Sequence, residues 1–176
     1  MALLLAAVSG CSAGRLGIAQ PRVSAGDADD VVTSLPSPAQ SVSLSIDPCS
    51  LLTADDLAGA GKFESRYEEQ GSARSCFWQK DFNGENDTFT FILSVRDSQG
   101  IDVLNDIGGG VVKEDVNKRP ATSTEDPESG DCVLALKLDI NARIDVTVLG
   151  EEGRNDSCEV AQGISRIFEP RLPEIP

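Results

Sequence analysis

Residues 131–148, which read DCVLALKLDINARIDVTV, decide the fold of this chain. In the first half of the stretch, apolar side chains occupy alternate positions: Cys132, Leu134, Leu136, Leu138 and Ile140. The pair Asn141-Ala142 follows, and apolar and polar residues then alternate again over residues 143–148. Alternation with a period of two is typical of β-strands. The stretch therefore predicts a β-hairpin with one buried face and one solvated face.

A helix is predicted on the C-terminal side of the hairpin. Asp156-Ser157 provides an N-cap, and Pro170 and Pro173 end the helix. Between them, apolar residues recur at helical spacing: Val160, Ala161, Ile164, Ile167 and Phe168. Such a stripe suits packing on the buried face of the hairpin. Residues 131–173 therefore form the scaffold on which we expect the rest of the domain to be built.

Weaker patterns predict the remaining elements. Further strands are expected at residues 63–67, 75–79, 88–95 and 111–116. Further helices are expected from Thr53 and over Ser98–Ile107, and residues 117–130 are expected to form an exposed loop. We therefore predict an α+β fold with an antiparallel β-sheet of about five strands and two disulfides. Two or three helices, which begin near Thr53, Ser98 and Cys158, would pack on one face of this sheet.

The composition divides the chain into three parts. Residues 1–10 are a short apolar run that reads as a signal peptide and is too short to span a bilayer. Residues 11–46 begin with Cys11, are rich in Ser, Ala, Gly, Pro and Asp, and predict a disordered tether with a reach of roughly 30 Å. Residues 47–176 predict one disulfide-containing α+β domain.

Cys11 ends the sequence Val8-Ser9-Gly10-Cys11, which closely resembles the bacterial lipobox. In a lipobox the cysteine thiol receives a diacylglycerol and becomes the first mature residue. Cys11 is therefore predicted to be lipidated and to anchor the protein to a membrane. No Lys or Arg precedes the apolar run, which indicates a translation start upstream of Met1. The alternatives are an ordinary signal peptide, or a chance apolar terminus with a free thiol at Cys11.

The other four cysteines predict two disulfides. Cys49, Cys76, Cys132 and Cys158 are well separated and form no Cys-x-x-Cys motif, which favours structural bridges in an oxidising compartment. Four cysteines allow three pairings. We favour Cys49 with Cys76 and Cys132 with Cys158, because each of these bridges would join the start of a helix to a nearby strand.

The composition argues against several classes of function. The chain has 29 acidic and 15 basic residues, a formal net charge of −14, so it lacks the basic surface that nucleic-acid binding requires. It contains no histidine, which removes Ser-His-Asp and Cys-His catalysis and the commonest zinc ligand. The acidic surface is interpreted as a solvated face of an extracellular protein, and recognition of cationic partners is the alternative interpretation.

Two kinds of side chain are candidates for a binding site. Tyr67 and Trp78 could line a ligand pocket, although a tryptophan beside a strand cysteine is more often part of the core. Acidic residues could hold calcium in two places: Glu125, Asp126, Glu128 and Asp131, or Asp81, Asn83, Glu85 and Asp87. Neither set has EF-hand spacing. No metal and no cofactor is therefore predicted.

Two further patterns carry no assignment. Gly108-Gly109-Gly110 could bind phosphate through its amides, but it follows the helix predicted at Ser98–Ile107 and is better explained as the end of that helix. The many carboxylates could provide an acid–base pair of the kind that glycosidases use. Nothing in the sequence selects one pair, so no catalytic residue is predicted.

Several segments occur together in a characteristic order. They are the lipobox and tether, Asp47-Pro48-Cys49-Ser50-Leu51-Leu52-Thr53, Cys76-Phe77-Trp78, Asp131-Cys132-Val133, residues 156–161 and Leu172-Pro173. In this combination the chain resembles an actinobacterial cell-envelope lipoprotein family, the domain of unknown function 3558. The resemblance implies a lipoprotein exposed outside the cytoplasmic membrane, and it implies no catalytic residue.

We therefore expect a lipid-anchored, extracytoplasmic protein on the outer face of the cytoplasmic membrane. Its expected role is that of a non-catalytic binding or sensing module, and it is expected to be a monomer. The expected partners are the membrane, through Cys11, and an unidentified envelope protein or small ligand. Two alternatives are an envelope enzyme that uses paired carboxylates and a structural accessory subunit of an envelope complex.

Overall fold

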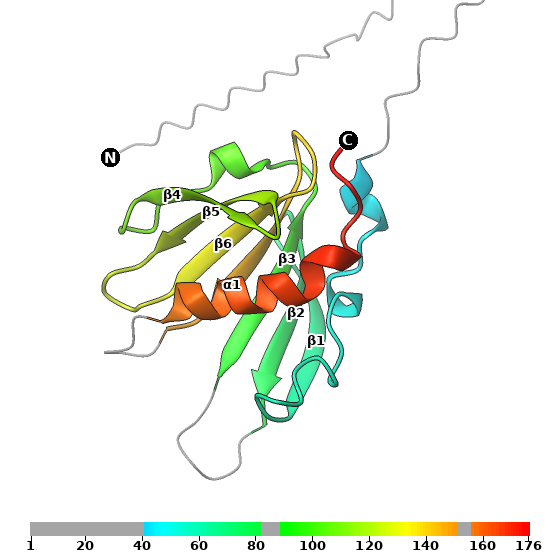
Figure 1. Ribbon diagram of the computed structural model, residues 1–176, viewed down its shortest axis with the longest axis vertical. Coiled ribbons are helices and arrows are strands. Elements are labelled where there is room, and N and C mark those ends of the chain that lie inside the picture. The colour runs from blue at the N-terminus through cyan, green and yellow to red at the C-terminus, as the bar shows by residue number, and fades with distance from the viewer. Residues whose placement is uncertain (1–40, 82–88, 151–155) are drawn as a thin grey trace, which may run out of the picture. The chain divides into compact units, whose positions relative to one another are not determined.

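The structure is a computed structural model that describes residues 41–81, 89–150 and 156–176 (Figure 1). Seven strands form one antiparallel sheet: β1 (Phe63–Gln70), β2 (Ala73–Lys80), β3 (Thr90–Arg96), β4 (Val111–Val116), β5 (Arg119–Glu125), β6 (Cys132–Lys137) and β7 (Arg143–Val148). One α-helix, α1 (Ser157–Phe168), follows the sheet. The described residues also contain four 3-10 helices: η1 (Val42–Ser45), η2 (Pro48–Ser50), η3 (Ile101–Val103) and η4 (Glu169–Arg171).

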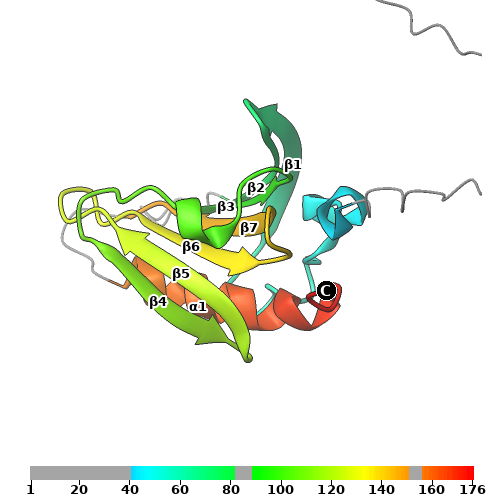
Figure 2. The same cartoon turned by 90° about the horizontal axis from the view of Figure 1, so that it is seen from above.

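The sheet consists of two meanders that meet in its middle. Strands β1, β2 and β3 pair in sequence, and the chain then crosses to the opposite edge, where β4, β5, β6 and β7 pair in sequence. Because β7 pairs with β3, the order is β1-β2-β3-β7-β6-β5-β4. The crossing segment, residues 97–110, passes over the face of the sheet opposite α1 (Figure 2).

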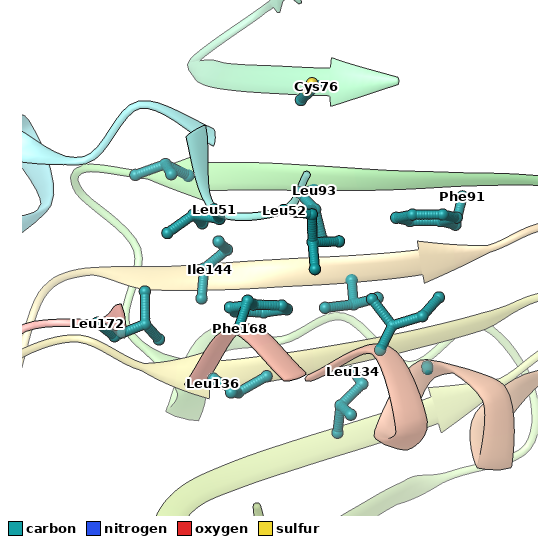
Figure 3. Close-up of a cluster of buried hydrophobic side chains, with 14 of the residues drawn as sticks. Leu51, Leu52, Cys76, Phe91, Leu93, Leu134, Leu136, Ile144, Phe168 and Leu172 are labelled. Carbon is teal, nitrogen blue, oxygen red and sulfur yellow. The ribbon is translucent and has the colours of Figure 1, made fainter. Parts of the chain in front are cut away.

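The apolar core lies on one face of the sheet beneath two covers. Helix α1 packs on β6 and β7, and its fully buried Phe168 lies beside strand residues Leu136 and Ile144 (Figure 3). The N-terminal cover, residues 46–57, packs on β1, β2 and β3 and contributes Leu51 and Leu52 to the same apolar cluster. The two covers therefore share one continuous core.

Each cover is joined to the sheet by a disulfide. Cys49 of η2 is bonded to Cys76 of β2, with 5.0 Å between their Cα atoms. Cys132 of β6 is bonded to Cys158 in the first turn of α1, with a Cα–Cα distance of 5.1 Å. These are the two pairs favoured from the sequence.

The hairpin and the C-terminal helix are confirmed, but the predicted fold class is wrong. The domain is mostly β, with seven strands and a single α-helix in its described residues, instead of about five strands with two or three helices. Thr53 begins only a turn. The Asp56 carboxylate accepts hydrogen bonds from the Thr53 amide and hydroxyl, each at 2.7 Å, so a capping interaction forms at Thr53 without an α-helix after it.

The helix predicted at Ser98–Ile107 is also absent, and only η3 forms there. The backbone of this segment bonds to the sheet that it crosses. Arg143 Nη1 donates to the Gly100 carbonyl at 2.9 Å, and the Ile107 amide donates to Thr124 Oγ1 at 3.1 Å. An α-helix would need backbone groups such as these for its own i to i−4 bonds.

The exposed loop predicted at residues 117–130 instead contains β5. Asn117 and Lys118, with φ of 48° and 78°, form a tight turn between β4 and β5, as two-residue hairpins require. Thr122 and Thr124 are buried on the face that the crossing segment passes over. Their polarity suggested exposure, whereas the crossing segment covers them.

The packed region begins before Asp47, inside the part assigned to the tether. Ile46 is buried, and the Arg74 guanidinium donates to the carbonyls of Ser43 and Ile46. Residues 41–46 therefore belong to the domain, while Cys11 and the rest of the predicted signal peptide and tether lie outside the described residues. Within the described part of the chain, none of the helices combines the length and apolarity needed to cross a bilayer.

Candidate functional site

Tyr67 and Trp78 do not form a shared pocket. Both side chains lie on the α1 side of the sheet, because the register pairs Tyr67 with Cys76 and places Trp78 two positions further along β2. Trp78 is only 4% exposed and stacks on Phe91, with 6.0 Å between ring centroids. Tyr67 is 46% exposed, and its hydroxyl donates to Glu69 at 3.3 Å. Trp78 is therefore a core residue, and Tyr67 is an edge-strand residue at the surface.

The acidic cluster around Asp126 serves the turn between β5 and β6. Asp126 Oδ1 accepts the amides of Glu128 at 2.8 Å and Ser129 at 3.3 Å, and these hydrogen bonds hold the pKa of Asp126 below its ordinary value. Asp131 Oδ1 accepts the Gly150 amide at 2.7 Å. Among the residues described, no group of three acidic or cysteine side chains is placed to hold a metal ion. The second calcium candidate lies outside them from residue 82 onward.

The amides of Gly108, Gly109 and Gly110 are all occupied within the protein. Gly108 and Gly110 donate to Asp106 Oδ1 at 2.8 and 2.9 Å, and Gly109 donates to the Glu125 carbonyl at 2.8 Å. A Cβ on Gly109 would come within 2.6 Å of that carbonyl oxygen, so the chain needs glycine there. The triplet therefore fastens the crossing segment to β5. It does not end a helix, and it does not present free amides to a phosphate.

A groove of about 360 Å³ lies between α1 and the β4–β5 hairpin. We call it the acidic groove and define it by its principal lining residues: Val112, Glu114, Ser123, Glu125, Glu159 and Gln162. The first two belong to β4, the next two to β5 and the last two to α1. No Lys or Arg lines the groove. Its surface therefore offers hydrogen-bond acceptors and negative charge.

The strand register distributes the groups along the groove. Val112 lies opposite Ser123, and Glu114 lies opposite Ala121, so Glu114 is near one end of the groove and Glu125 near the other. Ala121 and Glu125 are four residues apart, which corresponds to roughly 13 Å along a strand. Ser123 lies midway between them. The groove thus has two acidic ends and a central hydroxyl.

The groove differs from end to end in how its polar groups are bonded. At one end Gln162 Nε2 donates to the Glu114 carboxylate, and Gln162 Oε1 accepts from Arg166 at 2.7 Å. At the other end, the Glu125 and Glu159 carboxylates make no hydrogen bond or ion pair with any other described residue. These two carboxylates are available to a cation.

Ser123 is the most informative residue of the groove. It is 8% exposed, yet its hydroxyl has no hydrogen-bond partner in the described chain. Its oxygen is reached by solvent, because the fully buried side-chain atoms without a partner in the described residues are Trp78 Nε1 and Ser165 Oγ, so water in the groove can bond to it. Ser123 lines the groove, so a bound molecule can replace this water as the hydrogen-bond partner of the hydroxyl.

A second depression, of about 510 Å³, is a weaker candidate. Its acidic residues, Asp97 and Asp139, are already bonded: Asp97 to the Arg74 guanidinium at 2.9 Å and Asp139 to the Ser41 hydroxyl at 2.7 Å. Internal pairing has therefore satisfied the groups that would bind a ligand there. We take the acidic groove as the candidate site.

Sequence reasoning did not find the acidic groove. From the sequence, Glu125 was considered only as a calcium ligand, and Glu114 and Ser123 were not identified as candidates. The signal was present as alternation in the segment VVKEDV and in Ser123-x-Glu125, which places these side chains on one face of each strand. It could not be used because residues 117–130 were predicted to be a loop, which leaves β4 without a partner strand.

Comparisons with known proteins give one positive result. The model of a family described as "Protein of unknown function (DUF3558)" matches residues 6–171. The match therefore includes Cys11 as well as most of the folded domain. No curated protein and no solved structure matches the chain significantly.

Proposed function

The chain belongs to the DUF3558 family of proteins of unknown function, and from this premise we propose that it is a lipid-anchored, non-catalytic binding module of an actinobacterial cell envelope. The domain would lie on the outer face of the cytoplasmic membrane. Its lipid anchor would be attached at Cys11, and a tether would connect the anchor to the domain.

The observation that carries this proposal is the use of the five cysteines. Four of them are consumed in the bridges Cys49–Cys76 and Cys132–Cys158, so Cys11 is the one left over. Disulfides persist in oxidising compartments outside the cytoplasm. The remaining cysteine follows Val8-Ser9-Gly10, which is the position and context of a lipidated cysteine.

The tether fits an anchored domain. Residues 12–40 have the composition of a flexible coil, and a coil of this length has an r.m.s. end-to-end distance of roughly 30 Å. The described domain starts at residue 41, so such a tether would hold the domain near the membrane while leaving it free to turn. That arrangement suits a module that meets ligands in the envelope.

Binding is favoured over catalysis by the chemistry of the acidic groove. Ser123 has no hydrogen-bonded base within the described chain, and a serine nucleophile needs one. The other principal polar groups of the acidic groove are carboxylates and the Gln162 amide, which suit recognition of a positively charged molecule. The groove is therefore assigned to binding.

Lipidation and export are tested with the full-length chain produced in an actinobacterial host. We expect the protein in the membrane fraction, with a mature N-terminus at Cys11 whose mass includes acyl chains, and with no thiol that reacts before reduction. The variant Cys11→Ala should lose the added mass and leave the membrane fraction. A native chain that keeps residues 1–10, stays in the cytosol and has titratable thiols at Cys49 and Cys76 would contradict the proposal.

A further inference from the structure

We infer that the acidic groove binds a linear polyamine, an alkyl chain with ammonium groups at both ends and an amine within it. This inference deepens the proposed function and rests on the domain being a binding module. It starts from three observations: free carboxylates, an unpartnered hydroxyl on the largely buried residue Ser123, and the apolar surface between the acidic ends.

The spacing of the charges suits an extended cation. The acidic ends of the groove, at Glu114 and Glu125, are separated by roughly 13 Å along the strands. Within the described chain, no three acidic or cysteine side chains come close enough together to hold one metal ion. A compact ion would therefore meet only one end of the groove, whereas a linear molecule with separated charges can meet both.

The middle of the groove suits methylene groups. Val112 of β4 is 59% exposed although its side chain points to the α1 side of the sheet, and Cys158, whose sulfur is bonded to Cys132, also lines the groove. An alkyl segment laid across these side chains would remove apolar surface from water. A hydrophilic cation without such a segment would leave Val112 exposed.

The Ser123 hydroxyl provides an observation independent of the charges. Ser123 lies midway between the acidic ends and is 8% exposed as a residue, and its hydroxyl, which solvent reaches, has no partner in the described chain. A hydroxyl oxygen accepts hydrogen bonds, and the internal amine of a polyamine is a donor at the corresponding position. At the Glu125 end, the carboxylates of Glu125 and Glu159 would receive a terminal ammonium group.

The test is isothermal titration calorimetry of spermidine into the purified full-length chain, taken from whichever cell fraction contains it. We expect one saturable site whose affinity falls steeply with added salt, because charge pairs at an open groove are screened. The double variant Glu125→Gln/Glu159→Gln should bind at least about tenfold more weakly, since charge-assisted hydrogen bonds are about twice as strong as neutral ones.

Two controls separate the groove from general attraction to an acidic protein. Glu64→Gln/Glu174→Gln removes two negative charges from exposed residues outside the groove and should leave the affinity unchanged within about twofold. Ser123→Ala should weaken binding about threefold or more, because it removes an acceptor from the ligand. Its melting temperature should stay within about 2 °C of the parent, because no described hydrogen bond is lost.

The inference is overturned if spermidine shows no saturable binding, or if both double variants weaken it equally. Magnesium chloride is titrated in parallel. If the parent binds magnesium, and Glu125→Gln/Glu159→Gln weakens magnesium binding as much as spermidine binding, the groove is a metal site and the inference is overturned. Failure of the inference is distinguishable from failure of the proposed function, because the mass of the Cys11 segment is measured on the same preparation. If the chain is acylated but does not bind spermidine, only the inference of polyamine binding is refuted.

Discussion

The two covers on the core face of the sheet are held by different forces. Helix α1 satisfies most of its backbone hydrogen bonds internally and packs through apolar side chains such as Ile164 and Phe168. The N-terminal cover is irregular, and side chains from elsewhere in the fold bond its carbonyls. Arg74 donates to the Ile46 carbonyl of this cover and to the Ser43 carbonyl just before it, and Arg171 donates to the Leu51 carbonyl at 2.6 Å.

This difference teaches how a small domain can cover a wide sheet with one helix. A helix needs only an apolar face to pack on a sheet, because its own ladder satisfies the backbone. An irregular segment has carbonyls that would be buried unpaired, which is costly unless other groups donate to them. Arg74 and Arg171 therefore satisfy carbonyls of the N-terminal cover, whereas in α1 the helical hydrogen bonds satisfy the carbonyls.

The largest loss of stability is expected at Phe168, which is fully buried in the core shared by both covers. Phe168→Ala should reduce the free energy of unfolding by about 3–5 kcal/mol, because it removes a ring and leaves a cavity. Urea denaturation followed by Trp78 fluorescence and circular dichroism measures the loss. The neighbouring variant Ile167→Ala, at a side chain that is 40% exposed, should cost under about 1 kcal/mol and serves as the control.

The two disulfides allow the covers to be compared at equal loop length. Their sequence separations are 27 and 26, so chain entropy predicts the same loss, about 3–4 kcal/mol, for Cys49→Ala/Cys76→Ala and for Cys132→Ala/Cys158→Ala. Any difference between the measured losses then reports the packing of each cover. We expect limited proteolysis to cut residues 46–57 first in the former variant. Our comparison would be contradicted if the protease cut α1 free in Cys132→Ala/Cys158→Ala sooner than it cut the N-terminal cover in Cys49→Ala/Cys76→Ala.

A smaller effect is expected at Arg74, whose hydrogen bonds reach the N-terminal cover and not α1. Arg74→Met keeps the length of the side chain but leaves Asp97 and the Ile46 carbonyl without the Arg74 donor, while the Ser43 carbonyl keeps the Ile46 amide, and it should cost about 1–3 kcal/mol. Arg74→Lys keeps the charge and loses the fork-shaped donor set, so it should recover only part of this loss. Denaturation measures the loss, and hydrogen exchange should show faster exchange in residues 46–57 while α1 is unchanged.

The sequence predicted the elements whose burial follows a simple period. The β6–β7 hairpin and α1 were found because their apolar residues alternate or recur at helical spacing. The helix predicted at Ser98–Ile107 was wrong because its apolar residues recur every three positions, a spacing that also fits an α-helix. These residues, Ile101, Leu104 and Ile107, are instead half-buried on a segment that crosses the sheet. Thr122 and Thr124 misled in the opposite sense, since they are polar strand residues buried beneath that segment.

The candidate site was less predictable than the fold because it depends on strand pairing. The four domain cysteines could be paired from their expected positions on helices and strands. Glu114 and Ser123 approach one another only through the β4–β5 register, and Glu159 joins them from α1, so three segments must be placed before the acidic groove exists. A buried charge can also mislead: Asp145, expected on a solvated face, is 2% exposed and bonded to Arg143 at 2.7 Å.

The smallest expected difference between the covers is their response to acid. Hydrogen bonds from Arg171 and then Thr53 hold the pKa of Asp56 well below its ordinary value of 3.8, and a hydrogen bond from Arg74 lowers the pKa of Asp97. Both carboxylates belong to the bonds that hold the N-terminal cover. Because their folded-state pKa values are lowered, their contribution to stability is present above about pH 4 and is lost as the pH falls below that value.

Acid should therefore loosen residues 46–57 before α1. Hydrogen exchange at pH 6, 4 and 3, corrected for the intrinsic exchange rate, should show protection of the N-terminal cover falling first. In Asp56→Asn, protection of this cover should be lower at pH 6 and should depend less on pH, because the group that titrates is gone. Equal loss of protection in both covers between pH 6 and 3, with the same profile in Asp56→Asn, would mean that Asp56 does not distinguish them.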